Sequence, residues 1–396
     1  MALQFIDQAE LEGKRVLARF DFNVPFDKED KSKIADTSRI DLALPTIKYI
    51  LEQGASKLTL MSHLGRPKGK VDPNFSLEPV AEYLAQKLGV EVVVAETAVD
   101  SGVKELLTLR ETKIVLLQNL RYHAEEEVND ADFAHKLSQY GDVYINDAFG
   151  AAHRKHASVH AINKFFESRA FGGLLLKKEI ESLDKILNFP AKPFVAVVGG
   201  AKVSDKIATI EKLLVTVDSL IIGGAMAYPF LKAQGKEVGT SLCSDEDVTL
   251  AKKILKADKG NKIKLPCDHL VSSEFGGSPE ECSEVSIPNG KMGLDIGPAT
   301  INLYTETLKT AKTVLWNGPM GLFENENYAN GTMALAETLA TLDDAFTLVG
   351  GGDSVSAVKK SGFADKFSHI STGGGASLEY IEKGELPGVQ ALKFGV

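Results

Sequence analysis

Glycine-rich turns recur at the ends of apolar runs in the second half of this 396-residue chain. Five such runs stop at a turn of this kind that leads toward a helix-like segment: Val197–Lys202, Ile221–Gly224, Leu315–Pro319, Leu348–Asp353 and Ile370–Gly375. Glycine has no Cβ, so the backbone can turn sharply there and bring its N–H groups close to an anion at the start of a helix. The pattern predicts a doubly wound parallel sheet whose strand ends approach a phosphate-bearing ligand.

The first half of the chain has the same strand-then-loop rhythm, but its loops carry cations. Strands are expected over 15–20, 57–61, 91–95, 113–117 and 142–145, and helices over 41–53 and 77–88. Repeated alternation of strand and helix implies parallel strands joined by crossovers. The polar side chains at or beyond the ends of these strands are Arg19, Asn23, His63, Arg66, Arg121 and Arg154. Because ligands of open α/β sheets lie beyond the carboxyl ends of the strands, two such faces imply two binding sites.

The length of the chain predicts two domains, because a single hydrophobic core seldom grows so large. The rhythm pauses at Gly172-Gly173, a helix is expected from Leu174 to Leu187, and strands restart at Phe194. We therefore expect an α/β protein with two Rossmann-like, doubly wound parallel-sheet domains joined by a long helix and hinge. In the alternative interpretation, 174–187 is only another crossover helix.

Composition excludes several classes of protein. The chain is 44% apolar and 25% charged with a net charge of −9, which argues against nucleic acid or an anionic membrane as the main partner. The first 14 residues lack the apolar core of a signal peptide, and no apolar stretch is long enough to span a membrane. Cys243, Cys267 and Cys282 are odd in number and widely spaced, so free thiols in a reducing, cytoplasmic compartment are expected.

Arginines in the first half suggest a multiply charged ligand. Arg39 follows a potential helix cap at 36–38, and Arg66, Arg121 and Arg154 each follow a predicted strand. The guanidinium fork binds carboxylate and phosphate through two hydrogen bonds, so these groups suit a ligand with a carboxylate at one end and a phosphate at the other. The alternative is that each arginine is only a solvated surface residue.

Three nearby histidines could suggest a metal site. His153, His156 and His160 have neither a neighbouring cysteine nor the spacing of a known zinc motif, so metal binding is disfavoured. A histidine beside Arg154 is better explained as another donor to the same anion.

Charged residues near the glycine turns of the second half predict a nucleotide site. Lys202 is expected at the start of a helix, where a cation needs an anionic partner, and Lys206 could reach the same region. Asp353 follows three glycines and is suited to hold Mg²⁺, which proteins bind with one or two carboxylates plus substrate phosphates. Glu324 is a candidate for the ribose hydroxyls. Neither a P-loop nor a dinucleotide glycine fingerprint is present.

Five motifs together resemble the phosphoglycerate kinase family over essentially the whole chain: Arg19–Pro25, Ser62–Pro67, Gly199–Ile207, Trp316–Pro319 and Gly350–Ser354. The resemblance implies transfer of a phosphoryl group between 1,3-bisphosphoglycerate and MgADP in glycolysis, by a cytoplasmic monomer that closes about a hinge. It implies a 3-phosphoglycerate-binding domain over 1–172, an interdomain helix over 173–189, a nucleotide-binding domain over 190–372 and a returning C-terminal segment over 373–396. Two departures are Pro229, where threonine is expected, and 354–356, where other small residues are more usual.

The resemblance also implies site residues. Those expected to contact 3-phosphoglycerate are Asp21, Phe22, Asn23, Arg39, His63, Leu64, Gly65, Arg66, Arg121 and Arg154. Those expected to serve the nucleotide are Gly200, Lys202, Lys206, Gly224, Gly293, Asn317, Glu324, Gly350, Gly351, Gly352, Asp353 and Ser354, with Asp353 as the Mg²⁺ contact.

The residues themselves favour the same chemistry. The transition state of phosphoryl transfer carries negative charge on its equatorial oxygens, so a catalyst mainly positions the reactants and surrounds the moving group with donors. Arg39, Lys202 and the backbone at Gly352 and Gly375 are the expected catalytic donors. A two-domain binding protein without catalysis would explain the arginines but not Lys202 and Asp353. A dinucleotide-dependent dehydrogenase would need a glycine fingerprint that is absent.

Overall fold

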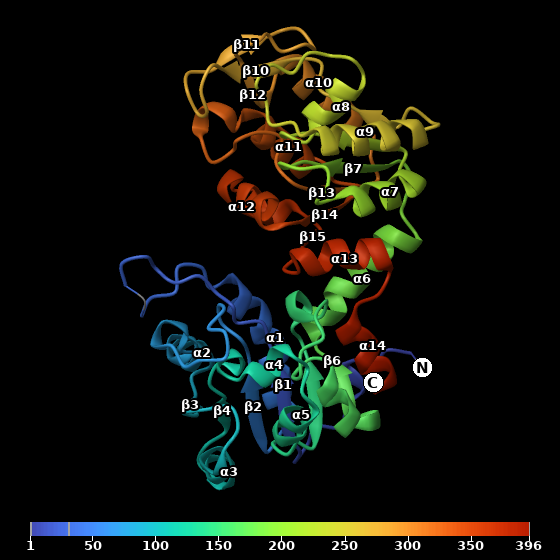
Figure 1. Ribbon diagram of the computed structural model, residues 1–396. Coiled ribbons are helices and arrows are strands. Elements are labelled where there is room, and N and C mark those ends of the chain that lie inside the picture. The colour runs from blue at the N-terminus through green and yellow to red at the C-terminus, as the bar shows by residue number, and fades with distance from the viewer. Residues whose placement is uncertain (1, 31, 396) are drawn as a thin grey trace. The chain divides into compact units, whose positions relative to one another are not determined.

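The computed structural model describes residues 2–30 and 32–395 and divides into two compact units. Unit 1 comprises Met1–Glu181 with Glu385–Val396, and unit 2 comprises Ser182–Gly384. Helix α6 (Leu174–Asn188) contains the division, close to the helix predicted over 174–187. The domain boundaries expected at 172, 189 and 372 stay predictions. Figure 1 shows one parallel sheet flanked by helices in each unit, as the sequence predicts.

Unit 1 contains a six-stranded parallel sheet in the order β3-β4-β2-β1-β5-β6. Its strands are β1 (Arg15–Arg19), β2 (Lys57–Met61), β3 (Val92–Val94), β4 (Ile114–Leu116), β5 (Val143–Asn146) and β6 (Ala170–Gly172). The first five lie where the sequence predicts strands, whereas β6 was not predicted. Every residue of β2, β4 and β5 is buried, as expected for parallel strands covered on both faces.

The helices of unit 1 cover both faces of this sheet. They are α1 (Ser38–Glu52), α2 (Glu78–Leu88), α3 (Ser101–Thr108), α4 (Ala124–Glu127), α5 (Ala131–Ser138) and α14 (Pro387–Phe394). Helix α2 ends at Gly89, whose φ of +67° a residue with a side chain seldom adopts. Gly388 N in α14 donates to Ala152 O at 2.8 Å, so this late segment belongs to the packing of unit 1.

Unit 2 contains a second six-stranded parallel sheet, in the order β15-β14-β13-β7-β8-β9. Its strands are β7 (Phe194–Val198), β8 (Ser219–Ile222), β9 (Ile263–Lys264), β13 (Thr313–Asn317), β14 (Phe346–Gly350) and β15 (His369–Ile370). Its helices are α7 (Ile207–Thr216), α8 (Ala227–Ala233), α9 (Asp245–Ala257), α10 (Pro298–Lys309), α11 (Asn330–Ala340), α12 (Gly352–Ser361) and α13 (Gly375–Lys383).

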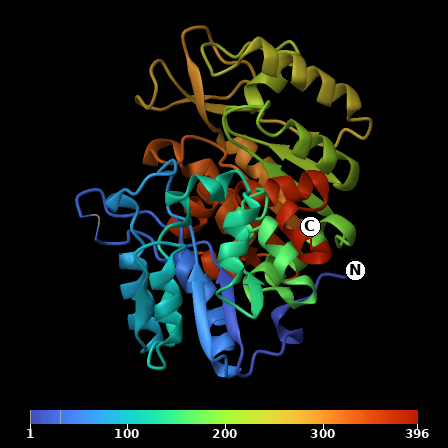
Figure 2. The same ribbon diagram turned by 60° about the horizontal axis from the view of Figure 1, so that its bottom comes forward.

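A separate antiparallel sheet in unit 2 was not predicted. It consists of β10 (His269–Ser272) between β11 (Glu280–Cys282) and β12 (Met292–Ile296). These strands lie in the yellow and orange part of the chain in Figure 2. Strand β11 is largely exposed and short, so its sequence lacks the continuous apolar run by which the parallel strands are recognised.

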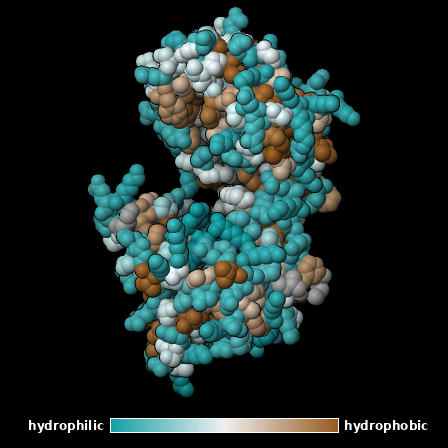
Figure 3. Space-filling view, viewed as in Figure 1, coloured by the Kyte–Doolittle hydropathy of each residue, from teal (hydrophilic) through white to brown (hydrophobic). Residues whose placement is uncertain are grey.

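The surface view is mostly hydrophilic, with hydrophobic residues in small scattered groups (Figure 3). Among the described residues, no helix has both the length and the apolar character needed to cross a bilayer. Cys243, Cys267 and Cys282 are free, as the sequence predicts.

Candidate functional site

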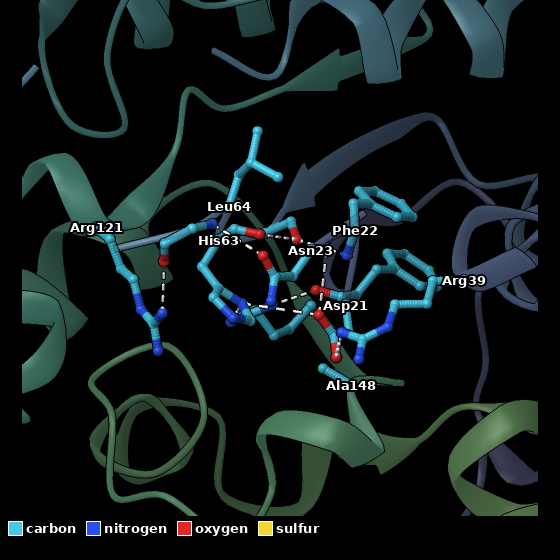
Figure 4. Close-up of polar contacts among 12 residues, drawn as sticks. Asp21, Phe22, Asn23, Arg39, His63, Leu64, Arg121 and Ala148 are labelled. Atoms are coloured by element: carbon cyan, nitrogen blue, oxygen red, sulfur yellow. Dashed lines mark hydrogen bonds and ion pairs between the residues drawn. The ribbon is translucent and has the colours of Figure 1, made fainter. Parts of the chain in front are cut away.

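Asp21 lies between the guanidinium group of Arg39 and the imidazole ring of His63, at the carboxyl end of the unit 1 sheet (Figure 4). Arg39, the second residue of α1, donates from Nη1 to Asp21 Oδ2 at 2.9 Å. His63 Nδ1 lies 3.9 Å from Asp21 Oδ1, too far for a hydrogen bond. The Arg39 side chain is 39% exposed, so an anionic ligand can reach it, whereas its partner Asp21 is only 12% exposed.

Asn23 and Gly65 join two strand-end loops. Gly65 N donates to Asn23 Oδ1 at 2.8 Å, and Gly65 O accepts from Arg121 Nη1 at 2.7 Å. A Cβ at Gly65 would lie 2.2 Å from the Phe75 ring, and its φ is +59°. Only glycine fits both restrictions, so this position fixes the approach of Arg121 to the loop.

Phe22 and Leu64 are predicted contacts whose side chains are fully or almost fully buried. Phe22 N donates to Ser62 Oγ at 2.8 Å, and Leu64 N donates to Asn119 Oδ1 at 3.1 Å. Ser62 and Asn119 therefore shape the site although they were not predicted. Asn119 could have been found, because it lies in the same loop as Arg121, whereas Ser62 differs in no obvious way from other serines.

Arginine and histidine side chains form a cationic cluster in unit 1, made of Arg19, His63, Arg121, Arg154 and His156. Burial, followed by the charges of Arg19 and Arg121, holds the pKa of His63 well below its ordinary value. Burial and the same arginines lower the pKa of His156 to about 3. Both rings are therefore neutral near pH 7, and the positive charge belongs to the guanidinium groups.

The remaining predicted residues of unit 1 lie nearer the surface. Arg66 is exposed, and Arg154 is half-buried with Nε donating to His153 Nε2 at 3.1 Å. His160 lies 3.4 Å from the Asn129 amide, through Nδ1. His153 and His160 thus have different partners, and His156 Nδ1 lies 3.9 Å from Glu126 Oε1.

In unit 2, three glycine loops pack backbone against backbone at the carboxyl ends of β7, β8 and β13. A Cβ on Gly199 would lie 2.0 Å from Pro319 O, one on Gly318 would lie 2.2 Å from Gly199 O, and one on Gly224 would lie 2.7 Å from Gly200 N. Gly199 N donates to Asn317 O at 2.9 Å. Glycine is required here because the loops contact each other, in addition to any ligand they bind.

The prediction that Lys202 begins a helix is wrong. Helix α7 begins at Ile207, with Lys206 as the preceding cap residue, and Lys202 lies exposed in the turn before it. Ser204 N in this turn donates to Asp247 Oδ1 at 2.9 Å, which ties the turn to α9. The turn after β13 also leads to no immediate helix, since α11 begins only at Asn330.

Lys206 is held against the glycine loops. Its ammonium group donates to Gly199 O at 2.7 Å and to Asn317 Oδ1 at 2.6 Å. Burial lowers its pKa to about 8, although Asp353 and Asp205 act in the opposite direction. The ammonium group is therefore mostly protonated at neutral pH, and the charge of Asp353 favours that form.

Two helices begin directly at glycine runs, as predicted. Gly350 ends β14 and Gly352 begins α12, with Gly351 at a φ of +86°. Asp353 is exposed in the first turn, and Ser354 Oγ accepts a hydrogen bond from Gly318 N. Gly375 begins α13, and a Cβ at Gly352 or Gly375 would meet nothing within 4 Å.

A pocket of about 300 Å³ lies beside these loops. Five predicted residues line it: Gly200, Gly224, Gly293, Glu324 and Asp353. The apolar residues that line it, Tyr228, Leu242, Phe275, Met292, Leu294 and Leu322, were not predicted. Except for Leu322, which follows β13, they lie outside the turns that end the parallel strands. A mostly apolar pocket with a few polar groups suits an aromatic base.

Within residues 2–30 and 32–395, no group of three or more His, Cys, Asp or Glu side chains is arranged to hold a metal ion. Asp353 supplies one exposed carboxylate at the pocket. Mg²⁺ commonly takes one or two carboxylates and completes its coordination with phosphates and water, so this donor set fits a metal that arrives with a nucleotide.

A cationic cluster on one parallel-sheet unit and a glycine-lined pocket on another define a two-domain α/β enzyme that handles anionic substrates. The model of the family "Phosphoglycerate kinase" matches residues 6–384. Phosphoglycerate kinase of Moorella thermoacetica is 51% identical over 397 residues, covering 99% of each chain, and that of Anaeromyxobacter dehalogenans (strain 2CP-C) is 50% identical over 404 residues, covering 99% of this chain and 100% of the relative. The solved phosphoglycerate kinase of Coxiella burnetii has a TM-score of 0.88 and 37% identity, covering 99% of this chain and 98% of that one.

The chain belongs to the phosphoglycerate kinase family. The reaction of this family is reversible phosphoryl transfer between 1,3-bisphosphoglycerate with ADP and 3-phosphoglycerate with ATP, a step of glycolysis. The chain is therefore a nucleotide-dependent phosphotransferase whose acceptor is a carboxyl group, and its substrates are small molecules. The binding-protein and dehydrogenase alternatives are excluded.

Proposed function

We propose that unit 1 binds 3-phosphoglycerate at the cationic cluster and that unit 2 binds ADP or ATP with Mg²⁺ at the glycine loops. One observation carries the assignment: guanidinium groups gather at the strand ends of unit 1, while close-packed glycines, Lys206 and Asp353 gather at those of unit 2. The acidic substrate needs fixed positive charge, whereas a nucleotide needs room for its phosphates and an apolar pocket for its base.

In this proposal, Arg39 and Arg121 contact the acidic substrate, with Arg66 and Arg154 at the exposed side of the site. Arg39 releases Asp21 as it takes up charge that develops on the transferred group. Backbone N–H groups at Gly352 and Gly375, at the starts of α12 and α13, surround the phosphoryl group together with Lys202. No general base is needed, because the attacking carboxylate is already ionised.

The Asp353 carboxylate holds Mg²⁺ in this scheme. When bound, the ion neutralises charge on the nucleotide phosphates and helps to orient them. Glu324 contacts the ribose, and the apolar residues of the pocket contact the base.

We also propose that the domains expected from the sequence carry these two ligands separately, with a hinge at the ends of α6 and the 373–396 segment. Reacting atoms must come within roughly 3 to 3.5 Å, so closure is expected only with both substrates. Small-angle scattering on apo, singly liganded and doubly liganded protein tests this. Contraction is expected chiefly with both ligands, and identical profiles in all four states would contradict it.

The proposal includes a monomer that acts in the cytoplasm. Light scattering coupled to size exclusion tests the oligomeric state, and fractionation of the source cells tests the location. A single species at about twice the 42.7 kDa chain mass would contradict the monomer.

The direct test of the ligand assignment is calorimetry with each ligand. Titration of 3-phosphoglycerate into the Arg121→Ala variant is expected to show weakened binding, with MgADP binding retained. The reverse is expected for Asp353→Asn. If both variants lose both ligands while keeping the unfolding midpoint of the unchanged protein, the division of ligands between the units is wrong.

A further inference from the structure

A buried carboxylate lies next to the cationic cluster. Glu126, in the short helix α4, is fully buried, although it is neither a predicted site residue nor part of the chemistry proposed above. Its Oε1 accepts from Ser158 Oγ at 2.6 Å, and its Oε2 accepts from Ser158 N at 2.9 Å. Burying a carboxylate is costly unless hydrogen bonds or opposite charges compensate it, so its retention here needs an explanation.

The Ser158 hydroxyl accepts one hydrogen bond and donates another. Arg19 Nε donates to Ser158 Oγ at 2.9 Å, and arginine cannot accept. The Ser158 hydroxyl proton is therefore free to point at Glu126 Oε1. The Ser158 backbone is held as well, because Ser158 O accepts from Tyr144 Oη at 2.7 Å. A chain of donors thus leads from Arg19 through Ser158 to Glu126.

The Arg19 guanidinium group also determines the tautomer of His63. Arg19 is fully buried, Nη1 donates to Phe20 O, and Nη2 lies 3.1 Å from His63 Nδ1. Because arginine only donates, His63 Nδ1 must accept, and the ring proton of neutral His63 is on Nε2. That Nε2–H is the donor which His63 retains for another partner.

We propose that Glu126 is a positioning residue for the anion site of unit 1, acting through Ser158 to hold Arg19 and thereby to keep His63 in the tautomer that donates from Nε2. This inference rests on the proposed function, since it takes His63 to be a donor to 3-phosphoglycerate. The adjacent Glu127 has a related part, with Oε1 3.2 Å from Arg121 Nε. Helix α4 thus contacts Arg121 directly through Glu127 and Arg19 indirectly, through Ser158 and Glu126.

Glu126→Gln separates positioning from simple electrostatics. The amide has the same shape, but its NH₂ group must face either Ser158 N–H or the Ser158 hydroxyl, so the donor chain is broken. Loss of a negative charge alone would strengthen the binding of an anion. Positioning predicts the opposite, a rise of about tenfold in KM for 3-phosphoglycerate with KM for ATP unchanged. Glu125→Gln is the matched control, because Glu125 is exposed on the same helix and the variant has the same net charge.

The tautomer of His63 gives a readout that a purely structural role would not move. Long-range ¹H–¹⁵N correlation spectra of histidine-labelled protein at pH 7 distinguish the two neutral tautomers, and the His63→Gln variant assigns the signal. We expect a single Nε2–H form in the unchanged protein and in Glu125→Gln, and a mixture in Glu126→Gln. Ser158→Ala, which removes only the hydroxyl link, is expected to give a mixture too and serves if Glu126→Gln fails to fold.

Three outcomes are decisive. A folded Glu126→Gln protein whose His63 tautomer and KM for 3-phosphoglycerate both match Glu125→Gln would overturn the inference, as would a fall in that KM. The same unchanged tautomer in Ser158→Ala would also overturn it. A separate failure, in which 3-phosphoglycerate does not shift the His63 signals of the unchanged protein, would contradict the proposed function and leave the tautomer result in the ligand-free protein intact.

Discussion

The two parallel sheets have the same number of strands, but their carboxyl ends differ. Unit 1 presents charged side chains there, whereas unit 2 presents glycine backbone. Unit 1 gathers charged side chains that are buried and held by hydrogen bonds, such as Arg19 and Arg121. Unit 2 gathers glycines whose missing side chains let the loops at Gly199, Gly224 and Gly318 touch. A site made of charged side chains depends on the residues that hold each side chain in place. A site made of backbone depends on glycines, because a Cβ at these positions would clash with the neighbouring loop.

This difference affects how each site tolerates change. In unit 1, substitution of a partly exposed donor such as Arg39 removes one group, whereas substitution of a buried supporting residue such as Glu126 also disturbs its neighbours. In both cases the effects should fall mainly on binding or catalysis. In unit 2, adding a single methyl group forces backbone atoms apart, so stability and nucleotide binding should fall together. The four predictions below test this comparison.

The largest effect is expected for Arg39→Ala. If Arg39 acts on charge that develops during transfer, kcat should fall by about 10²- to 10³-fold, while both KM values change much less. Steady-state kinetics with the unfolding midpoint measured alongside checks this. Asp21→Asn, which removes the partner of Arg39 in the free protein, should change kcat far less. An unchanged kcat with a raised KM for 3-phosphoglycerate would make Arg39 a ground-state contact.

Gly199→Ala tests whether added bulk in a glycine loop of unit 2 lowers stability and nucleotide binding together. Its Cβ would lie 2.0 Å from Pro319 O, so we expect a loss on the order of 1–3 kcal/mol in the free energy of unfolding and at least tenfold weaker binding of ADP. Denaturant unfolding and calorimetry measure the two effects. Gly352→Ala is the control, because its Cβ would meet nothing within 4 Å and the N–H group is kept. Equal stability of the two variants would show that the loops are not packed as described.

Asp353→Asn should act on one unit alone. We expect roughly tenfold weaker binding of MgADP, with the affinity for 3-phosphoglycerate unchanged. Asp365→Asn, an exposed aspartate also in unit 2, makes the same change in net charge and should bind MgADP normally. Titrating ADP with and without Mg²⁺ separates the metal from the nucleotide. An equal loss for ADP without the ion would remove Asp353 from the metal site.

The smallest effect concerns the pH dependence that Lys206 confers. Its pKa is about 8 in the folded protein, below the ordinary lysine value, so the unfolded state binds more protons between these two values. Burying the ionised Lys206 side chain therefore lowers the free energy of unfolding below pH 8. This destabilisation disappears as the pH rises from 8 toward the pKa of lysine in the unfolded chain. ADP affinity should move the other way, falling roughly fivefold between pH 7 and 9 as the cation is lost.

Comparison with Lys206→Met isolates that effect. The variant should lack the rise in stability above pH 8 that Lys206 contributes, and its ADP affinity should vary less with pH. Parallel pH profiles of the two proteins, for both unfolding and binding, would show that Lys206 does not titrate in this range.

Sequence alone predicted most of the parallel strands and three of the helices. Strand β2 was predicted residue for residue, and α1, α2 and α6 to within a few residues, because buried parallel strands are continuous apolar runs and helices have a regular apolar spacing. The antiparallel strands β10 to β12 were missed; β11 is exposed and lacks the continuous apolar run of the parallel strands. The expected start of a helix at Lys202 was wrong: the chain forms a turn there that is tied to α9 by the hydrogen bond from Ser204 to Asp247, and α7 begins only at Ile207.

By itself, the sequence determined the class of fold, the family and the residue types available at each strand end, because these depend on local pattern and on motifs that are contiguous in the chain. Tertiary structure alone decided which of those residues are buried and what they contact. Gly199 needs to be glycine because of Pro319, and Arg19 is oriented by Ser158, a residue 139 positions away. No local pattern encodes such pairs, because residues far apart in the sequence become neighbours only in the folded chain.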